Sequence, residues 1–117
     1  MNQTNLRRLI NHLRSIKPSQ FAMGEWVVNK DRTRAPVLER ATCGTAGCVA
    51  GHVVVGFRDE LPASGDIQTA AAEWLGINED DAYDLFYGHW PNRQSGQFLD
   101  DLTVEQAIEH LESLVDA

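Results

Sequence analysis

Residues 43–52, with the sequence CGTAGCVAGH, constrain the fold of this chain more than any other stretch. Gly47 and Gly51 lie four positions apart, and each glycine inside a helix costs up to about 1 kcal/mol relative to alanine. Two such glycines indicate that a backbone or a tryptophan ring packs closely against this segment. We therefore expect residues 45–57 to form a buried helix against which other elements of the fold pack.

The apolar pattern of the rest of the chain predicts a mainly α-helical fold of about five helices. Apolar residues recur at the spacing of an amphipathic helix in four further segments, which are residues 5–16, 66–75, 79–87 and 104–115. A short strand or β-hairpin is expected near residues 25–40, with its bend at residues 29–31. The length of 117 residues is typical of one domain, so we expect residues 1–117 to form a single compact helical domain.

Polar residues and glycines mark where these helices begin and end. Thr4, Asn78 and Thr103 stand at expected N-cap positions. Thr103 is followed three residues later by Gln106, which completes a capping-box pattern. Gly76 is placed to terminate the helix over residues 66–75.

Charge is divided unequally along the chain. Residues 1–40 carry eight basic and three acidic residues, a net charge of +5, whereas residues 41–117 carry two basic and fourteen acidic residues, a net charge of −12. Such halves can attract each other within one fold or across a homodimer, or each can present a face to a charged partner.

The acidic half contains a helix–Gly–helix pattern that resembles a helix-turn-helix. Its second helix carries four carboxylates, namely Glu79, Asp80, Asp81 and Asp84. Because these would repel phosphates, DNA binding is disfavoured. The same carboxylates, together with Tyr87, His89 and Trp90 in the following loop, are the candidate partner-binding residues.

Cys43, Cys48 and His52 are the candidate ligands of a structural zinc ion. Thiolates and imidazoles suit zinc, and Cys48 and His52 would share one face of a helix. The close cysteine pairs typical of such sites are missing from the sequence, however. Buried cysteines and a hydrogen-bonded histidine explain the same residues without a metal, so we expect no cofactor.

Cys43 is also the candidate nucleophile of a cysteine-dependent enzyme. A thiol at a helix N-terminus has a lowered pKa, and the free N–H groups there can stabilise an oxyanion. His89 and His110 are the candidate bases. Nothing in the sequence selects either histidine.

Three blocks of the chain resemble a group of small uncharacterised bacterial and phage proteins. The blocks are CGTAGCVAGH, AAEWLGI at residues 71–77 and LFYG at residues 85–88. They match C-G-T-x-x-C-x-x-G-[HW], A-A-x-W-L-G-[IL] and L-F-x-G with fitting spacing. The resemblance implies that the three blocks belong to one fold, and it assigns no activity.

These observations favour a non-enzymatic regulatory or protein-interaction domain that binds another protein through an acidic surface. A phage or mobile-element inhibitor would be a concrete form of it. The N-terminus lacks the apolar run of a secretion signal, and no segment approaches the ~20 apolar residues of a membrane helix. We therefore expect a cytoplasmic protein without membrane contact, whose cysteines are free thiols.

Overall fold

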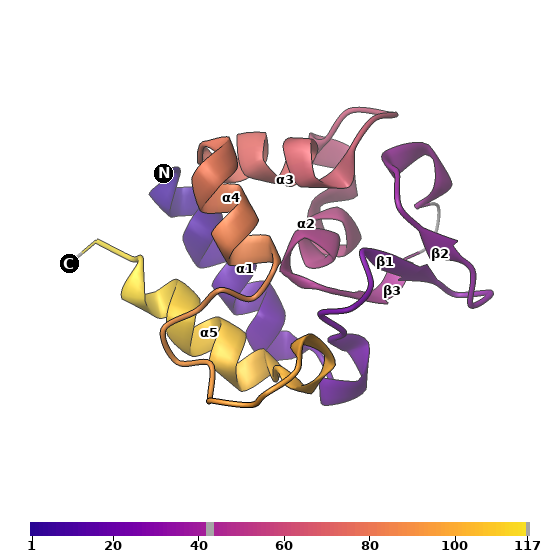
Figure 1. The fold of residues 1–117 in the computed structure, drawn as a ribbon. Coiled ribbons are helices and arrows are strands. Elements are labelled where there is room, and N and C mark those ends of the chain that lie inside the picture. The colour runs from indigo at the N-terminus through magenta and orange to yellow at the C-terminus, as the bar shows by residue number, and fades with distance from the viewer. Residues whose placement is uncertain (42–43, 117) are drawn as a thin grey trace.

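The computed structural model describes residues 1–41 and 44–116, and over these residues the fold is mainly α-helical, as the sequence predicts (Figure 1). The α-helices are α1 (Gln3–Ser15), α2 (Val49–Phe57), α3 (Ile67–Leu75), α4 (Glu79–Phe86) and α5 (Val104–Ser113). Short 3₁₀ turns lie at Pro18–Gln20, Leu38–Arg40, Arg58–Glu60 and Leu99–Asp101. The described elements pack into one compact globule.

A small antiparallel sheet lies beside the helices. β1 (Val27–Asn29) is its central strand, flanked by β2 (Arg34–Ala35) and β3 (Gly44–Gly47). The β1–β2 hairpin confirms the expected hairpin near residues 25–40. β3 was missed, and the expected helix over residues 45–57 is wrong in its first turn, because residues 44–47 pair with β1 and the helix begins only at Val49.

The two glycines explain why the chain takes this course. A Cβ on Gly51 would lie 1.5 Å from the Trp26 carbonyl oxygen, and a Cβ on Gly47 would lie 2.3 Å from the same atom. The expected close approach is therefore confirmed, and the approaching group is a backbone carbonyl. The glycines belong to different elements, Gly47 to β3 and Gly51 to α2.

Helix boundaries follow the capping residues with one exception. Asn2, and not Thr4, caps α1 by accepting a hydrogen bond from the Asn5 N–H at 3.0 Å. Asn78 caps α4 and Thr103 begins a capping box on α5, as expected. Gly76 ends α3 with φ of 69°, a conformation that favours glycine.

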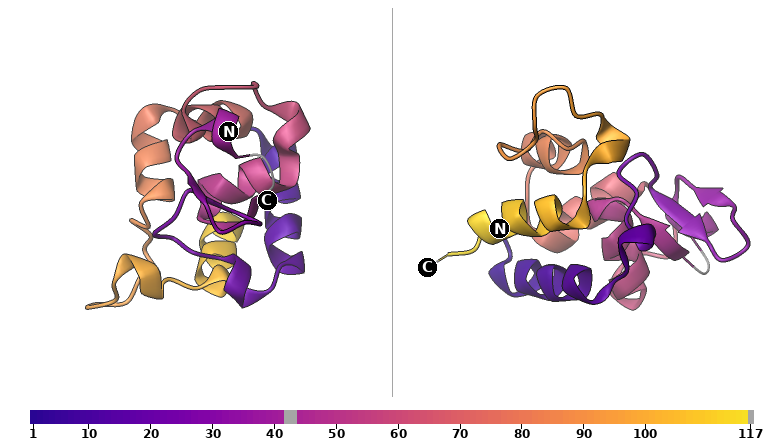
Figure 2. Two further views of the ribbon diagram at one scale, coloured as in Figure 1. Left: turned by 90° about the vertical axis from the view of Figure 1, so that its right-hand side faces the viewer. Right: turned by 90° about the horizontal axis from the view of Figure 1, so that it is seen from below.

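The helices surround α2, which carries the most buried part of the chain. Helices α1 and α5 lie side by side at one end of the molecule, and the sheet lies at the other (Figures 1 and 2). The apolar face of α1 is completely buried through Leu6, Leu9, Ile10 and Leu13. Helix α4 lies at the surface with one face exposed, which positions its acidic residues for contact with solvent.

Within the described residues, no helix combines the length and apolar character needed to cross a membrane.

Candidate functional site

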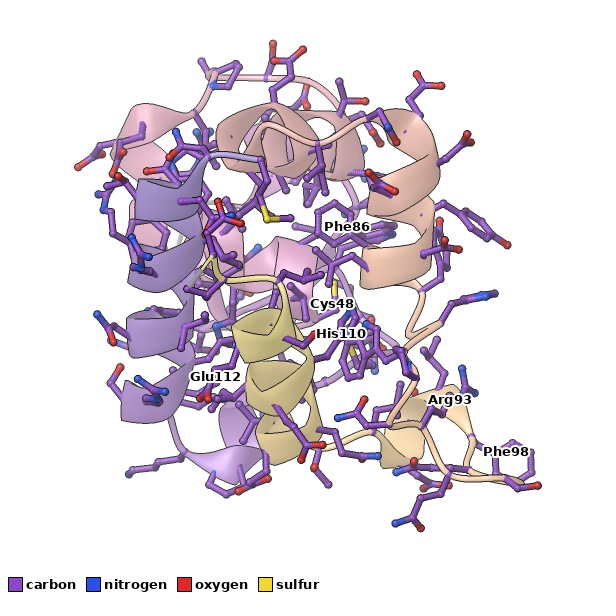
Figure 3. All side chains as sticks on the ribbon, turned by 90° about the vertical axis from the view of Figure 1, so that its left-hand side faces the viewer. Cys48, Phe86, Arg93, Phe98, His110 and Glu112 are labelled. Atoms are coloured by element: carbon purple, nitrogen blue, oxygen red, sulfur yellow. The ribbon has the colours of Figure 1, made fainter. Side chains whose placement is uncertain are left out.

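Cys48 lies at the start of α2 and caps the helix with its side chain. Its Sγ accepts a hydrogen bond from the Gly51 N–H at 3.4 Å. The side chain is buried and lines a small cavity of about 90 Å³ with Trp26 and Phe86. Cys48 and Phe86 are labelled in Figure 3. Burial raises the pKa of the Cys48 thiol to about 11. A thiol that stays protonated at neutral pH is a poor nucleophile.

His52, one turn further along α2, is enclosed by hydrogen-bonding partners. Its side chain is fully buried, its Nδ1 lies 3.0 Å from His12 Nε2, and its Nε2 lies 2.6 Å from the Gln20 carbonyl oxygen. The pKa of His52 is lowered to about 4, mainly by burial and to a smaller extent by the nearby His12, against the raising effect of the Gln20 carbonyl. Both ring nitrogens are thus engaged within the fold.

The zinc and nucleophile hypotheses both depend on Cys43, which lies outside the described residues. Among residues 1–41 and 44–116, no group of three or more His, Cys, Asp or Glu side chains could hold a metal ion. Cys48 and His52 therefore do not form a metal site with other residues in that part of the chain. The part of each hypothesis that rests on Cys43 stays a prediction.

We call the set of Cys48, Gly51 and His52 with their contacts the α2 junction. Its contacts are the carbonyls of Trp26 and Gln20 and the ring of His12. The polar side chains of the α2 junction are buried or hydrogen-bonded. The junction therefore holds together α1, α2 and the segment that contains Gln20 and Trp26. His12 was missed at the sequence level, although its position three residues after buried Leu9 places it at the edge of the apolar face of α1.

His89 and His110, the candidate bases, lie at a different place. They line one hollow of about 330 Å³ together with Asp81 and Asp84. His110 stacks on Trp90 with ring centroids 5.8 Å apart, and partial burial lowers its pKa. Cys48 does not line this hollow, and in the described part of the chain neither histidine has a hydrogen bond to a nucleophilic side chain.

The four candidate carboxylates all lie exposed on α4. They contribute to two different hollows. Glu79 and Asp80 line a groove of about 730 Å³ between α3 and α4, to which Glu73 and Tyr83 also contribute, whereas Asp81 and Asp84 face the hollow with the histidines. Within residues 1–41 and 44–116, none of the four forms an ion pair with a basic side chain.

Aromatic rings continue this acidic surface. Tyr83 and Tyr87 are 51% and 36% exposed, and their ring centroids lie 4.8 Å apart. His89 contacts Tyr83 at 5.3 Å, and Trp26 meets Tyr87 edge-on at 5.9 Å. The exposure of Tyr83 adds it to the candidate surface.

Trp90 has to be removed from the candidate surface. Its side chain is only 4% exposed, and its indole N–H donates to the Leu85 carbonyl at 2.8 Å. The position of Trp90 in the loop after α4 suggested exposure, but the indole packs back against the end of α4 and stacks on His110. The exposed aromatic residue of that loop is instead Phe98, which projects from its tip (Figure 3).

Four exposed residues repeat at helical spacing along one face of α4 and its C-cap, and we call them the acid–aromatic stripe. They are Asp80, Tyr83, Asp84 and Tyr87. The spacing i, i+3, i+4, i+7 places them on one face of the helix. Carboxylates and aromatic rings therefore alternate on a surface that solvent can reach.

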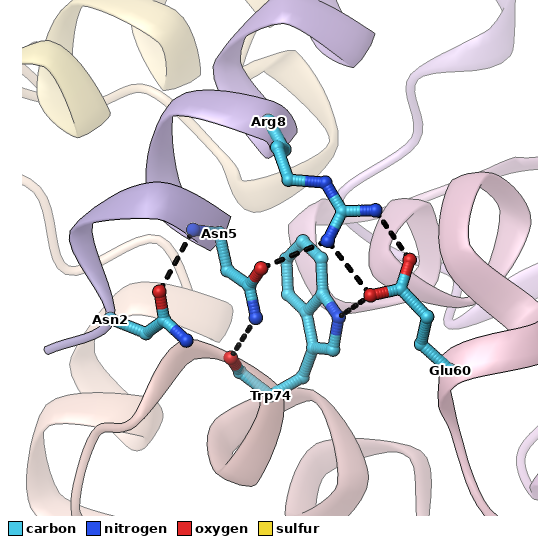
Figure 4. Close-up of polar contacts among 5 residues, drawn as sticks. All are labelled: Asn2, Asn5, Arg8, Glu60 and Trp74. Carbon is cyan, nitrogen blue, oxygen red and sulfur yellow. Dashed lines mark hydrogen bonds and ion pairs between the residues drawn. The ribbon is translucent and has the colours of Figure 1, made fainter.

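Elsewhere in the molecule, aromatic rings and a carboxylate also lie together, and there they bind an arginine of the chain itself. The guanidinium of Arg8 lies 4.8 Å from the Phe57 ring centroid and 5.6 Å from that of Trp74. Two of its nitrogens donate to the carboxylate of Glu60 at 2.8 and 2.5 Å, and Glu60 also accepts from the Trp74 indole N–H (Figure 4). The Glu60 hydrogen bond raises the pKa of Arg8, and Arg8 lowers the pKa of Glu60. Aromatic rings and a carboxylate thus hold one arginine in this fold.

Comparison with known proteins adds no relative: no family model, no curated protein and no solved structure matches this chain.

Proposed function

We propose that this chain is a non-enzymatic interaction domain that binds a basic, arginine-bearing segment of another protein through the acid–aromatic stripe. The observation that carries the proposal is the stripe itself, where Asp80 and Asp84 are exposed beside two tyrosine rings in contact. Surfaces that bind partners are enriched in aromatic residues, and an arginine guanidinium stacks on rings while it bonds carboxylates.

The surroundings of Arg8 support arginine as the group that is bound. There, two rings and one carboxylate hold a guanidinium that belongs to the chain itself. The stripe offers the same two kinds of group without a basic side chain from the described residues. The adjoining groove of about 730 Å³ adds Glu73 and Glu79 and gives room for several residues of a partner.

A concrete form of the proposal is an inhibitor of a nucleic-acid-binding protein. The basic surface of such a protein recognises phosphates, and the carboxylates of α4 would occupy it in their place. The resemblance to phage and bacterial proteins motivates this form, with a phage or mobile element as the source and the bacterial cytoplasm as the location. A second copy of this chain, offering its basic residues 1–40, is the alternative partner.

The test is a binding titration with labelled peptides of matched length. One peptide alternates arginine with glycine, a second alternates lysine with glycine, and a third alternates glutamate with glycine. We expect the arginine peptide to bind most tightly, the lysine peptide several-fold more weakly because ammonium groups do not stack on rings as guanidinium does, and the glutamate peptide not at all.

A pair of matched variants locates the binding surface. The first variant neutralises α4 with E79Q, D80N, D81N and D84N, and the second removes the same number of exposed charges elsewhere with D59N, E105Q, E109Q and D116N. The α4 variant should lose at least tenfold in affinity for the arginine peptide, and the second variant less than threefold. Equal losses in both would show that only net charge matters, which would contradict the proposal.

A further inference from the structure

Two histidines from distant parts of the sequence, the buried His52 and the partly buried His12, form a chain of hydrogen bonds. His12 on α1 lies 3.0 Å from His52 on α2, and His52 continues the chain to the Gln20 carbonyl at 2.6 Å. Phe21 stacks over His52 and Phe57 meets His12 edge-on. The pair thus joins α1, α2 and the turn Pro18–Gln20, and it lies apart from the acid–aromatic stripe.

The chemistry of the partners fixes where the protons lie. A carbonyl oxygen only accepts hydrogen bonds, so the Nε2–H of His52 donates to Gln20. The Nδ1 of His52 then carries a lone pair, and it accepts the Nε2–H of His12. In this neutral state each of the two contacts has one donor and one acceptor.

Protonation of this pair proceeds in two unequal steps. A first proton can reach only the outer nitrogen of His12, its Nδ1, which packs closely against Gly56. A second proton would have to go to His52 Nδ1, where it would face the Nε2–H of His12 at 3.0 Å. That step replaces a hydrogen bond with two opposed N–H groups and two adjacent positive charges in the interior.

The elements packed around the pair offer little compensation for a positive charge. The charged residues Arg8 on α1, Lys17 after α1 and Arg58 after α2 are all cations. The thiol of Cys48 at the start of α2 is neutral. Glu60 is already committed to Arg8. Among residues 1–41 and 44–116, no carboxylate bonds either imidazole ring.

We propose that the His12–His52 pair is a proton-sensitive joint, which holds α1, α2 and the turn Pro18–Gln20 together only while the His52 ring is neutral. Burial lowers the pKa of both histidines below the usual 6.5, that of His52 to about 4. The unfolded chain therefore binds more protons than the folded one between pH 6.5 and about 4. The stability that depends on the pair is complete above pH 6.5 and is lost as the pH falls toward 4.

The test is urea unfolding of wild-type protein and variants between pH 7.5 and pH 5. This window lies above the range in which carboxylates with lowered pKa, such as Glu60 and Glu39, lose their contribution. For His52 alone, the folding equilibrium constant of the wild type should fall on the order of 30-fold across the window. His52→Gln should fall at least tenfold less, and His12→Gln should also fall less than the wild type.

His89→Gln, at an exposed position, is the matched control and should keep the wild-type dependence. His110 is also partly buried with a lowered pKa, so the comparison uses the difference between wild type and His52→Gln and not the wild-type slope alone. Equal pH dependence in wild type and His52→Gln would overturn the proposal.

A second measurement applies even where His52→Gln does not fold. The imidazole C–H resonances of native wild-type protein can be followed by NMR from pH 8 to pH 5. The resonance of His52 should not titrate while the protein remains folded. A His52 resonance that titrates near pH 6.5 in folded protein would also overturn the proposal.

Discussion

The α2 junction and the acid–aromatic stripe differ in how far their polar groups are satisfied within the fold. At the junction, the thiol of Cys48 and both ring nitrogens of His52 have partners, and the Trp26 carbonyl leaves no room for a Cβ on Gly51. On the stripe, Asp80 and Asp84 are exposed and form no ion pair with the described residues. We therefore assign a structural role to the junction and propose the stripe as the partner-binding surface.

The largest effect that this comparison predicts is that of Gly51→Ala. The added Cβ would lie 1.5 Å from the Trp26 carbonyl oxygen, so two backbones must move apart. We expect a loss of about 3 kcal/mol or more in the free energy of unfolding, measured by urea denaturation. In Gly56→Ala the added carbon would lie 2.9 Å from His12 Nδ1, and a smaller loss than for Gly51→Ala is expected because an imidazole ring shifts more readily than a backbone carbonyl and the helix gains propensity. Equal effects of the two substitutions would contradict the proposed close packing.

Thiol labelling is expected to show the next largest difference. In a Cys43→Ser variant, Cys48 is the remaining cysteine, and both burial and its pKa of about 11 protect it. At pH 7.5 the native protein should react with an aromatic disulfide reagent at least about 100-fold more slowly than the same variant in urea. Rapid native-state labelling would show that the junction is open and would make Cys48 a candidate for chemistry.

A smaller effect is predicted for the cap of α4. Asn78→Ala removes the side-chain oxygen that accepts the Asp81 N–H at 2.8 Å, and a loss of about 1 kcal/mol is expected from thermal or urea unfolding. Asn78→Asp keeps an acceptor at the same place and should retain most of the stability. A full loss in Asn78→Asp as well would mean that the cap is not what stabilises α4.

The smallest effect on stability is predicted for the stripe itself. Asp84→Asn lies beyond the first turn of α4 on an exposed position, so the free energy of unfolding should change by less than about 0.5 kcal/mol. Glu109→Gln on α5 is a matched control. A stability loss above about 1 kcal/mol for Asp84→Asn would show that the stripe has a structural role.

The sequence predicted the local features of the fold better than its long-range contacts. The helices, the Asn78 and Thr103 caps and the Gly76 stop depend on neighbouring residues, and the structure confirms them. The strand β3 escaped prediction because its four residues become extended only by pairing with β1, which is distant in sequence. The N-cap of α1 is Asn2 and not Thr4, because the Asn2 N–H donates a hydrogen bond to the Leu75 carbonyl at the end of α3 and fixes the chain before α1.

The candidate site shows the same division. The exposure of the four α4 carboxylates follows from their position on one amphipathic helix, and the structure agrees. The burial of Trp90 and the pairing of His12 with His52 depend on contacts between separate elements. No local pattern encodes such contacts, so sequence reasoning placed Trp90 at the surface and overlooked His12.

The most direct test of the central claim is a chemical-shift map of peptide binding on isotope-labelled protein. The arginine–glycine peptide is titrated into wild-type protein, and the backbone amide shifts are followed by NMR. We predict that the largest shifts fall on α4 and on the groove residues of α3, with those of Gly51 and His52 nearly unchanged. Absence of binding, or shifts centred on the α2 junction, would contradict the assignment of function to the acid–aromatic stripe.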